Sequence, residues 1–130
     1  MQRVRVSSLL LVLLFMSGMA VAQQGTDPEW TAPAKEASRA NPFASKPQLA
    51  AGGAKVFART CASCHGDAAH RAATHAPDLS GSAVQAQSDG ALFWKITNGN
   101  TRKAMPAWGS LPEPQRWQIV LYLRTLREPK

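Results

Sequence analysis

The chain of 130 residues is short of cysteine and of acidic side chains, and each shortage excludes a class of protein. Two cysteines are too few for the disulfide scaffold of a small secreted protein. Eight acidic residues against 15 lysines and arginines give a formal net charge of +7, which suits nucleic acid, anionic lipid or an acidic protein as a partner. Glycine and proline number nine each, so collagen and low-complexity polymers are excluded, and the length fits one domain.

Long apolar runs are also lacking. Leu9–Met16 is an unbroken run of eight apolar residues, whereas a membrane span needs about 20. Arg3 and Arg5 precede it and the small residues of Ala20–Ala22 follow it, so residues 1–22 are predicted to be a signal peptide cleaved after Ala22. An uncleaved anchor is the alternative, which the short run disfavours. We expect a periplasmic protein with no stable membrane anchor and a net charge of +5, because cleavage removes two arginines and no acid.

Residues 23–47 carry four prolines and no sustained apolar period. Proline fixes φ and removes a backbone donor, so a long helix or a central strand is disfavoured here. We interpret this segment as an extended proline-rich arm or linker. Trp30 and Phe43 would attach it to the surface of the domain, and a disordered tether is the alternative.

The remaining residues, 48–130, have helical patterns and no alternating strand pattern. The first pattern is alanine-rich and runs from Ala50 to Arg59, with Ala54, Phe57, Ala58 and Cys61 near one face. A second helix is expected after Ser88 as N-cap and is expected to end near Asn98-Gly99. The third runs from Glu113 to Arg127, with Ile119, Tyr122 and Leu126 in its apolar stripe.

Long loops separate these helices, over Gly66–Gln87 and Gly99–Pro112. Loops of this length are unusual in a compact domain unless something functional holds them. A domain of this size also buries only about 60–65% of its unfolded surface and is marginal alone. We therefore expect a bound group to form part of the core.

The sequence Cys61-Ala62-Ser63-Cys64-His65 has the C-x-x-C-H pattern by which c-type haem is attached. Side chains at i and i+3 of a helical turn lie on one face, about 5–6 Å apart, so both sulfurs can bond one edge of a porphyrin. His65 follows directly and is the predicted proximal iron ligand. A disulfide here would close a very short loop, and a thioredoxin-like pair would need a βαβ context. A zinc site with His70 and His75 would have a spacing unlike that of the common fingers.

Met105 is the predicted second axial ligand. It lies in a polar, proline-bounded loop, and no other methionine remains after signal cleavage, so a role as core filler is disfavoured. A thioether ligand favours ferrous iron and raises the reduction potential. His70 and His75 are rivals, but their separation from His65 is too short to reach the opposite face of a flat ring easily.

The motifs taken together resemble one protein family. The stretch from about residue 53 to 126 resembles a monohaem class I cytochrome c of the bacterial periplasmic type, related to haem subunits of terminal oxidases and dehydrogenases. The matching motifs are Gly53-x-x-x-Phe57 before CASCHG, Ala76-Pro77-Asp78-Leu79, Lys95-Ile96-x-x-Gly99, Met105-Pro106-Ala107-Trp108 and Trp117-x-x-Val120-x-Tyr122-Leu123-x-x-Leu126.

This resemblance implies an all-α fold, with three to four short helices and long loops wrapped around one covalent haem c. It implies that the first and last helices cross at Gly53, with Phe57 and Tyr122 nearby. It also implies that the Pro77 carbonyl accepts a hydrogen bond from the second ring nitrogen of the proximal histidine. Trp94 and Trp108 are expected to wall the haem pocket, with plain core packing as the alternative.

The function predicted from these motifs is electron transfer, with no catalytic residue. Basic residues at the exposed haem edge would favour a redox partner with an acidic docking surface, and solvated surface charge is the alternative. The residues concerned are Lys95, Arg102, Lys103 and either Lys55 or Arg59. Nucleic acid is disfavoured because the basic residues are scattered and the chain is predicted to be exported. Two alternatives stay open, namely a haem subunit permanently docked to a dehydrogenase or terminal oxidase, and a peroxidase-like haem enzyme if Met105 does not ligate.

Overall fold

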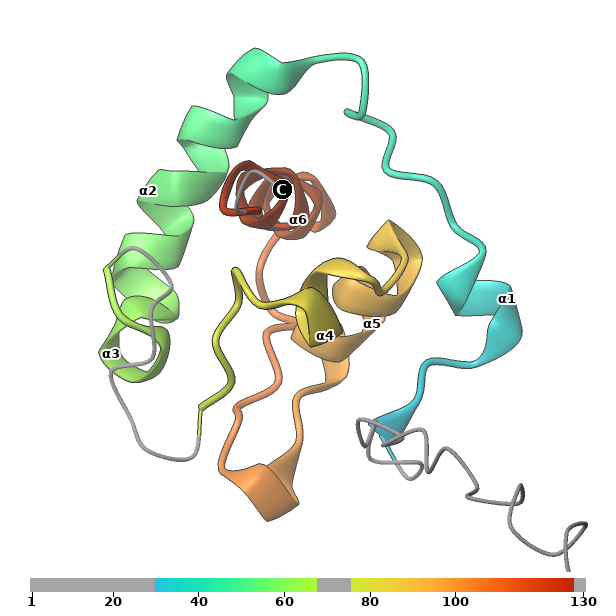
Figure 1. Cartoon of the computed structure of the whole chain (residues 1–130), viewed down its shortest axis with the longest axis vertical. Coiled ribbons are helices and arrows are strands. Elements are labelled where there is room, and N and C mark those ends of the chain that lie inside the picture. The colour runs from blue at the N-terminus through green and yellow to red at the C-terminus, as the bar shows by residue number, and fades with distance from the viewer. Residues whose placement is uncertain (1–29, 68–75, 128–130) are drawn as a thin grey trace, which may run out of the picture.

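The structure, a computed structural model, describes residues 30–67 and 76–127, and within these ranges it contains helices and no strand. This confirms the predicted all-α fold (Figure 1). A single antiparallel bridge joins Asn100 and Met105. The predicted signal peptide, His70 and His75 lie outside the described residues. The elements in chain order are α1 (Ala34–Ala37), the short 3₁₀ turn η2 (Pro47–Leu49), α2 (Ala50–Thr60), α3 (Ala62–His65), α4 (Ser82–Gln85), α5 (Asp89–Asn98), the 3₁₀ turn η3 (Thr101–Lys103) and α6 (Glu113–Thr125).

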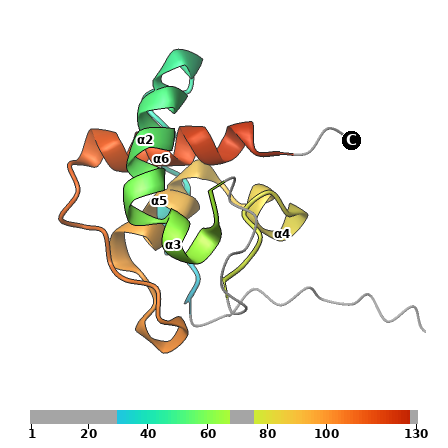
Figure 2. The ribbon, with the colours of Figure 1, turned by 90° about the vertical axis from the view of Figure 1, so that its left-hand side faces the viewer.

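The crossing of α2 over α6 organises the fold, as Figures 1 and 2 show. The two helices approach at Gly53, where an added Cβ atom would lie 1.9 Å from the backbone oxygen of Gln118. Only a residue without a side chain allows this approach. The predicted crossing at Gly53 is therefore confirmed, and Phe57 and Tyr122 pack beside it with ring centroids 5.2 Å apart.

The core lies between α2, α5 and α6, and its most deeply buried side chains are Phe57, Ile119 and Val120. The predicted face of α2 is partly wrong, because Ala58 is exposed while Val56 is buried. Gly53, Val56 and Phe57 share a face at the i, i+3, i+4 spacing, and Ala58 is rotated away from it. The last helix ends at Thr125, two residues before the predicted end.

Helix α5 begins and ends where its sequence signals predict. The Ser88 hydroxyl accepts a hydrogen bond from the Ala91 amide at 3.2 Å, which caps the first turn. Gly99 follows the last residue of the helix with φ of 62°, a conformation that favours glycine. On the buried face of α5, the Phe93 ring stacks on Trp117 of α6 with centroids 4.0 Å apart.

The segment from Trp30 to Pro47 folds back along α5 and α6 (Figure 1). Its short helix α1 packs against α5, so the segment is not extended throughout. The buried Asn41 amide donates to the Trp117 carbonyl oxygen at 3.1 Å, and Phe43 packs against the core. The division of the chain into residues 1–22, 23–47 and 48–130 stays a prediction. Among the helices of the described residues, none has the length and apolar character required to span a membrane.

Candidate functional site

The C-x-x-C-H sequence forms a separate helical turn directly after α2. Cys61 ends α2, since its amide donates to the Phe57 carbonyl, and its own carbonyl accepts from the amides of Cys64 and His65 at 3.1 and 3.0 Å. Gly66, with φ of 79°, then ends α3. Both cysteines are free thiols and half-buried, so the turn presents two sulfur atoms from one short element.

Cys61 is held as a neutral thiol by its surroundings. Burial raises the pKa of Cys61 above its ordinary value, and the neighbouring Cys64 acts in the same direction. The Thr60 hydroxyl, 3.2 Å from the Cys61 sulfur, opposes this by favouring the thiolate. Sequence reasoning did not single out Thr60, because a threonine at a helix end carries no signal of its own.

His65 is oriented by the loop that follows it. Its Nδ1 atom lies 3.4 Å from the Pro77 carbonyl oxygen, as the family resemblance implied. Because a carbonyl oxygen only accepts, this contact requires the tautomer with the proton on Nδ1, which leaves the lone pair on Nε2. Burial lowers the pKa of His65, and the Pro77 contact offsets only part of this effect. The ring is therefore neutral at pH 7. A neutral imidazole with a free Nε2 is the form that binds a metal.

Met105 lies at the end of a loop that starts directly after α5 and returns to it. The backbones of Asn100 and Met105 exchange two hydrogen bonds of 2.8 and 2.9 Å, and η3 forms the tip between them. The Trp108 amide then donates to the Ile96 carbonyl at 3.0 Å. Asn100 was not among the predicted residues, because pairing across a loop leaves no periodic signal in the sequence.

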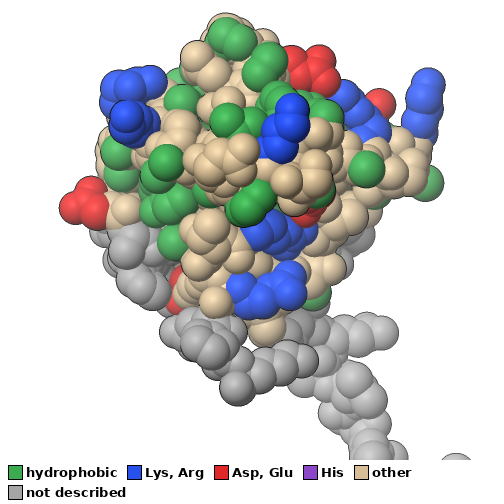
Figure 3. Space-filling model, turned by 90° about the horizontal axis from the view of Figure 1, so that it is seen from above, with side chains coloured by type: hydrophobic (Ala, Val, Ile, Leu, Met, Phe, Trp, Pro, Cys, Tyr) green, Lys and Arg blue, Asp and Glu red, His purple; other side chains and the backbone are tan. Residues whose placement is uncertain are grey.

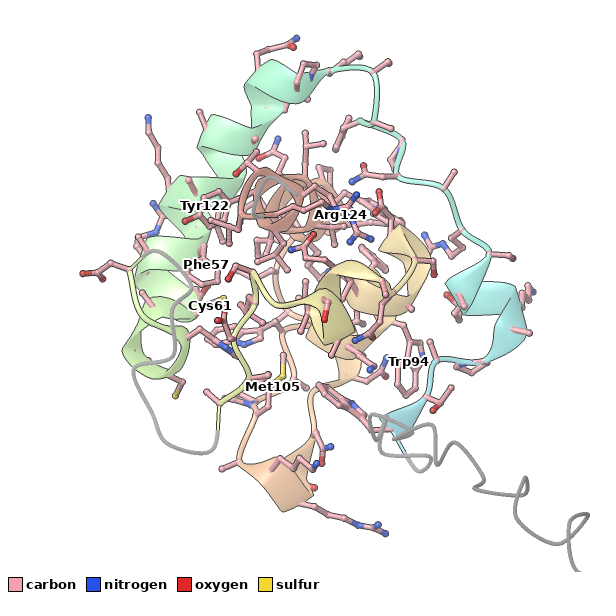
Figure 4. All side chains as sticks on the ribbon, in the orientation of Figure 1. Phe57, Cys61, Trp94, Met105, Tyr122 and Arg124 are labelled. Carbon is pink, nitrogen blue, oxygen red and sulfur yellow. The ribbon has the colours of Figure 1, made fainter. Side chains whose placement is uncertain are left out.

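Figure 4 shows Cys61 and Met105 on the same side of α5. Pro77 reaches that side through its contact with His65, and Trp108 packs against the adjoining core. These are the predicted site residues that the structure brings into one region. Among the predicted basic residues, Arg102 and Lys103 are exposed on η3 beside Met105, while Lys95 lies over the Trp30 ring.

Trp94 is not part of this region. Figure 4 shows it on the other side of α5, where it lines an open depression with Arg39 and Glu113. The buried residues of α5 are Gly90, Leu92, Phe93 and Ile96. Because successive helical residues are rotated by about 100°, burial of Phe93 turns Trp94 away from the core. The structure therefore does not place Trp94 where a wall of the predicted haem pocket was expected.

The donor set fits a c-type haem better than a bare metal ion. Two thiols from one turn, a neutral imidazole and a thioether are soft or borderline ligands that suit haem attachment and axial ligation of iron. Within residues 30–67 and 76–127, no three His, Cys, Asp or Glu side chains gather to hold a metal ion by themselves.

A comparison with known families agrees with this donor set. The family described as cytochrome c oxidase, cbb3-type, subunit III matches residues 48–123, which is more than half of the chain. The matched range contains the C-x-x-C-H turn, Pro77 and Met105, and the predicted resemblance to a c-type cytochrome is confirmed. The chain thus belongs to the family of cytochrome c oxidase, cbb3-type, subunit III, whose shared unit is a c-type cytochrome domain that serves haem-based electron transfer.

Proposed function

We propose that this chain is a periplasmic electron carrier that holds one haem c through Cys61 and Cys64, with His65 and Met105 as axial ligands. The observation that carries the proposal is the position of the thiol turn and the Met105 loop on one side of α5, with the Nε2 lone pair of His65 left free. When bound, haem c supplies one-electron exchange between ferric and ferrous iron.

The residues of this chain would hold and orient the haem and its iron ligands, and they would not react themselves. The Pro77 carbonyl fixes the tautomer and the plane of His65, which is how contacts behind a ligand tune a metal. The paired backbones of Asn100 and Met105 fix the main chain that carries the thioether, so less order is lost when it ligates. No side chain in the proposal gains or loses a proton during turnover, in keeping with a carrier that has no catalytic residue.

Two experiments test the ligand set on the mature, haem-loaded protein. A pyridine haemochrome assay should show covalent haem, and the ferric spectrum should show a methionine-to-iron charge-transfer band. Met105→Leu should abolish that band, whereas Trp94→Phe should keep it because Trp94 lies on the other side of α5. Absence of the band in the wild type, together with rapid cyanide binding, would overturn the assignment of Met105 and favour the peroxidase-like alternative.

A second candidate function is that of a haem subunit permanently docked to an oxidase. The family description, an oxidase subunit, favours it. In either case we propose a partner with an acidic surface, because the formal charge would be +5 after the predicted cleavage and Arg102 and Lys103 are exposed beside Met105. Lys and Arg side chains, with a few acidic ones, also lie on the face seen in Figure 3. Purification of the native protein at high salt distinguishes the two functions, because salt screens the attraction that would hold a transient carrier on an acidic partner. A soluble carrier should elute alone, and co-elution with a membrane oxidase would favour the docked subunit.

A further inference from the structure

Trp30 lies outside the range matched by the family and contacts the loop that carries Met105. Its indole Nε1 donates a hydrogen bond of 2.8 Å to the Gly99 carbonyl oxygen, across 69 positions of sequence. The Lys95 ammonium lies 4.6 Å from the centroid of the Trp30 ring, within the range of a cation–π contact. The Trp30 side chain is therefore fixed at both its polar edge and its face.

Gly99 transmits this contact to Met105 because the two backbones touch. An added Cβ atom at Gly99 would lie 2.5 Å from the Pro106 carbonyl carbon and 2.6 Å from the Met105 carbonyl oxygen. Gly99 also precedes Asn100, whose backbone exchanges two hydrogen bonds with Met105. A rotation of the Gly99 peptide would therefore displace both sides of the paired loop.

We infer that Trp30 is a positioning residue for Met105. The indole N–H fixes the Gly99 carbonyl and so holds the start of the loop from Asn100 to Met105 in its paired form. This inference rests on the proposed ligation by Met105. It also gives the segment before residue 48 a role at the site, since that segment supplies a restraint that the matched family range does not contain.

The test compares two variants of the haem-loaded protein. Trp30→Phe keeps an aromatic face for Lys95 and removes the N–H donor. Imidazole is added as a ligand that competes with Met105 for the ferric iron. We expect Trp30→Phe to bind imidazole about fivefold more tightly than the wild type does, which is the equilibrium equivalent of one net hydrogen bond. We also expect faster amide hydrogen exchange at Asn100 and Met105, which does not depend on electron-transfer activity.

Asn41→Ala is the matched control, because it removes an anchor of the same segment at another place. Its side chain donates to the Trp117 carbonyl and accepts from the Phe43 amide, and both of these contacts lie away from the Met105 loop. We expect a lower denaturation midpoint for this variant, with imidazole affinity within about twofold of the wild type. Equal rises in imidazole affinity in both variants would show a merely structural role and overturn the inference.

The spectra separate this inference from the proposed function. If the wild type shows the methionine-to-iron band and Trp30→Phe binds imidazole as the wild type does, the positioning role is refuted and ligation by Met105 stands. If the wild type lacks the band, ligation by Met105 fails and the positioning role fails with it.

Discussion

Gly53 illustrates how one residue without a side chain can decide a fold. An added methyl group at this position would meet the backbone of α6, at 1.9 Å from the Gln118 oxygen and 2.4 Å from its carbonyl carbon. Backbone atoms in the middle of a helix cannot rotate away as a side chain can, so the two helices would have to separate. We expect Gly53→Ala to lower the free energy of unfolding by about 3 kcal/mol, as overpacking in a core does, measured by urea denaturation.

Gly52 offers a matched control for this prediction. Its added Cβ atom would lie 2.7 Å from the Gln118 side-chain oxygen, which can move aside because it is the end of a flexible side chain. Alanine is favoured over glycine in a helix by about 1 kcal/mol, so Gly52→Ala should be neutral or slightly stabilising. A similar loss of stability in both variants would contradict the close crossing at Gly53.

Arg124 joins three elements of the fold in a way that no other residue type could reproduce. From α6 its guanidinium donates to the Asp89 carboxylate at 2.7 Å, to the carbonyl of Gln85 at the end of α4 and to the Gln87 carbonyl that follows (Figure 4). The Arg124 and Asp89 side chains are 21% and 26% exposed, so the pair is partly shielded from water. The planar fork of arginine suits several acceptors at once, whereas lysine offers a single charged point.

Replacement of Arg124 should therefore lower the stability of the fold, and lysine at this position should not restore that stability in full. We expect Arg124→Met to lower the free energy of unfolding by about 2–3 kcal/mol, because it removes the donor to the Asp89 carboxylate and to the partly buried Gln87 carbonyl, with only partial recovery in Arg124→Lys. Urea denaturation provides the measurement. Arg127→Met is the control, since Arg127 makes one contact of 3.2 Å to the same Gln85 carbonyl. Equal losses in the two methionine variants would contradict the central role of Arg124.

Glu113 ties the segment before α2 to α6 and makes this contact sensitive to acid. The Trp117 indole N–H, 3.2 Å away, and then the Arg39 guanidinium, 2.7 Å away, hold the pKa of Glu113 below its ordinary value of 4.5. The unfolded chain therefore takes up this proton at a higher pH than the folded one. The stability that these contacts contribute is complete above the ordinary pKa and is lost as the pH falls through the lowered pKa.

The acid sensitivity can be measured against Glu113→Gln. We expect the wild type to have the higher denaturation midpoint at pH 7 and the difference between the two proteins to shrink steadily as the pH is lowered below 4.5. The glutamine variant serves as the reference because it cannot titrate. A difference that stays constant over this acid range would show that the Glu113 contacts do not depend on its charge.

Elements that depend on local sequence signals could be predicted, whereas contacts between residues far apart in the sequence could not. The Ser88 cap and the Gly99 stop of α5 were predicted because both depend on neighbouring residues. Helices α1 and α4 were not predicted as helices, since four residues are too few to show a period. The contacts of Asn41 and Arg124 were also missed, because they span 76 and 35 or more positions and have no periodic pattern.

The candidate site was predictable to a similar extent and for similar reasons. The C-x-x-C-H spacing and the isolated Met105 are visible in the sequence itself, so their elements could be anticipated. The side of α5 on which Trp94 lies could not be predicted. Leu92-Phe93-Trp94 is continuously apolar, and a helical period cannot assign a face within such a run. Packing of Phe93 against Trp117 decides it.

The charge of the whole molecule gives a prediction about its reactions with small redox reagents. The formal net charge is +7 for the full chain and would be +5 after the predicted cleavage. We therefore expect oxidation of the reduced protein by anionic ferricyanide to slow as salt is added, because screening weakens the attraction. Oxidation by a cationic cobalt complex should instead become faster with salt, and stopped-flow absorbance measures both rates.

The position of the charge, and not only its total, should matter if electrons pass near the Met105 loop. Lys103 is exposed on η3 beside Met105, whereas Lys35 is exposed on α1, on the other side of α5 (Figure 1). Lys103→Gln and Lys35→Gln change the net charge equally. At low salt we expect Lys103→Gln to slow the ferricyanide reaction about tenfold, because one unit charge and the triply charged ferricyanide ion interact by about 1.5 kcal/mol at roughly 8 Å in water, and we expect Lys35→Gln to slow it less. Equal slowing by both variants would place the route of electron transfer away from the Met105 loop.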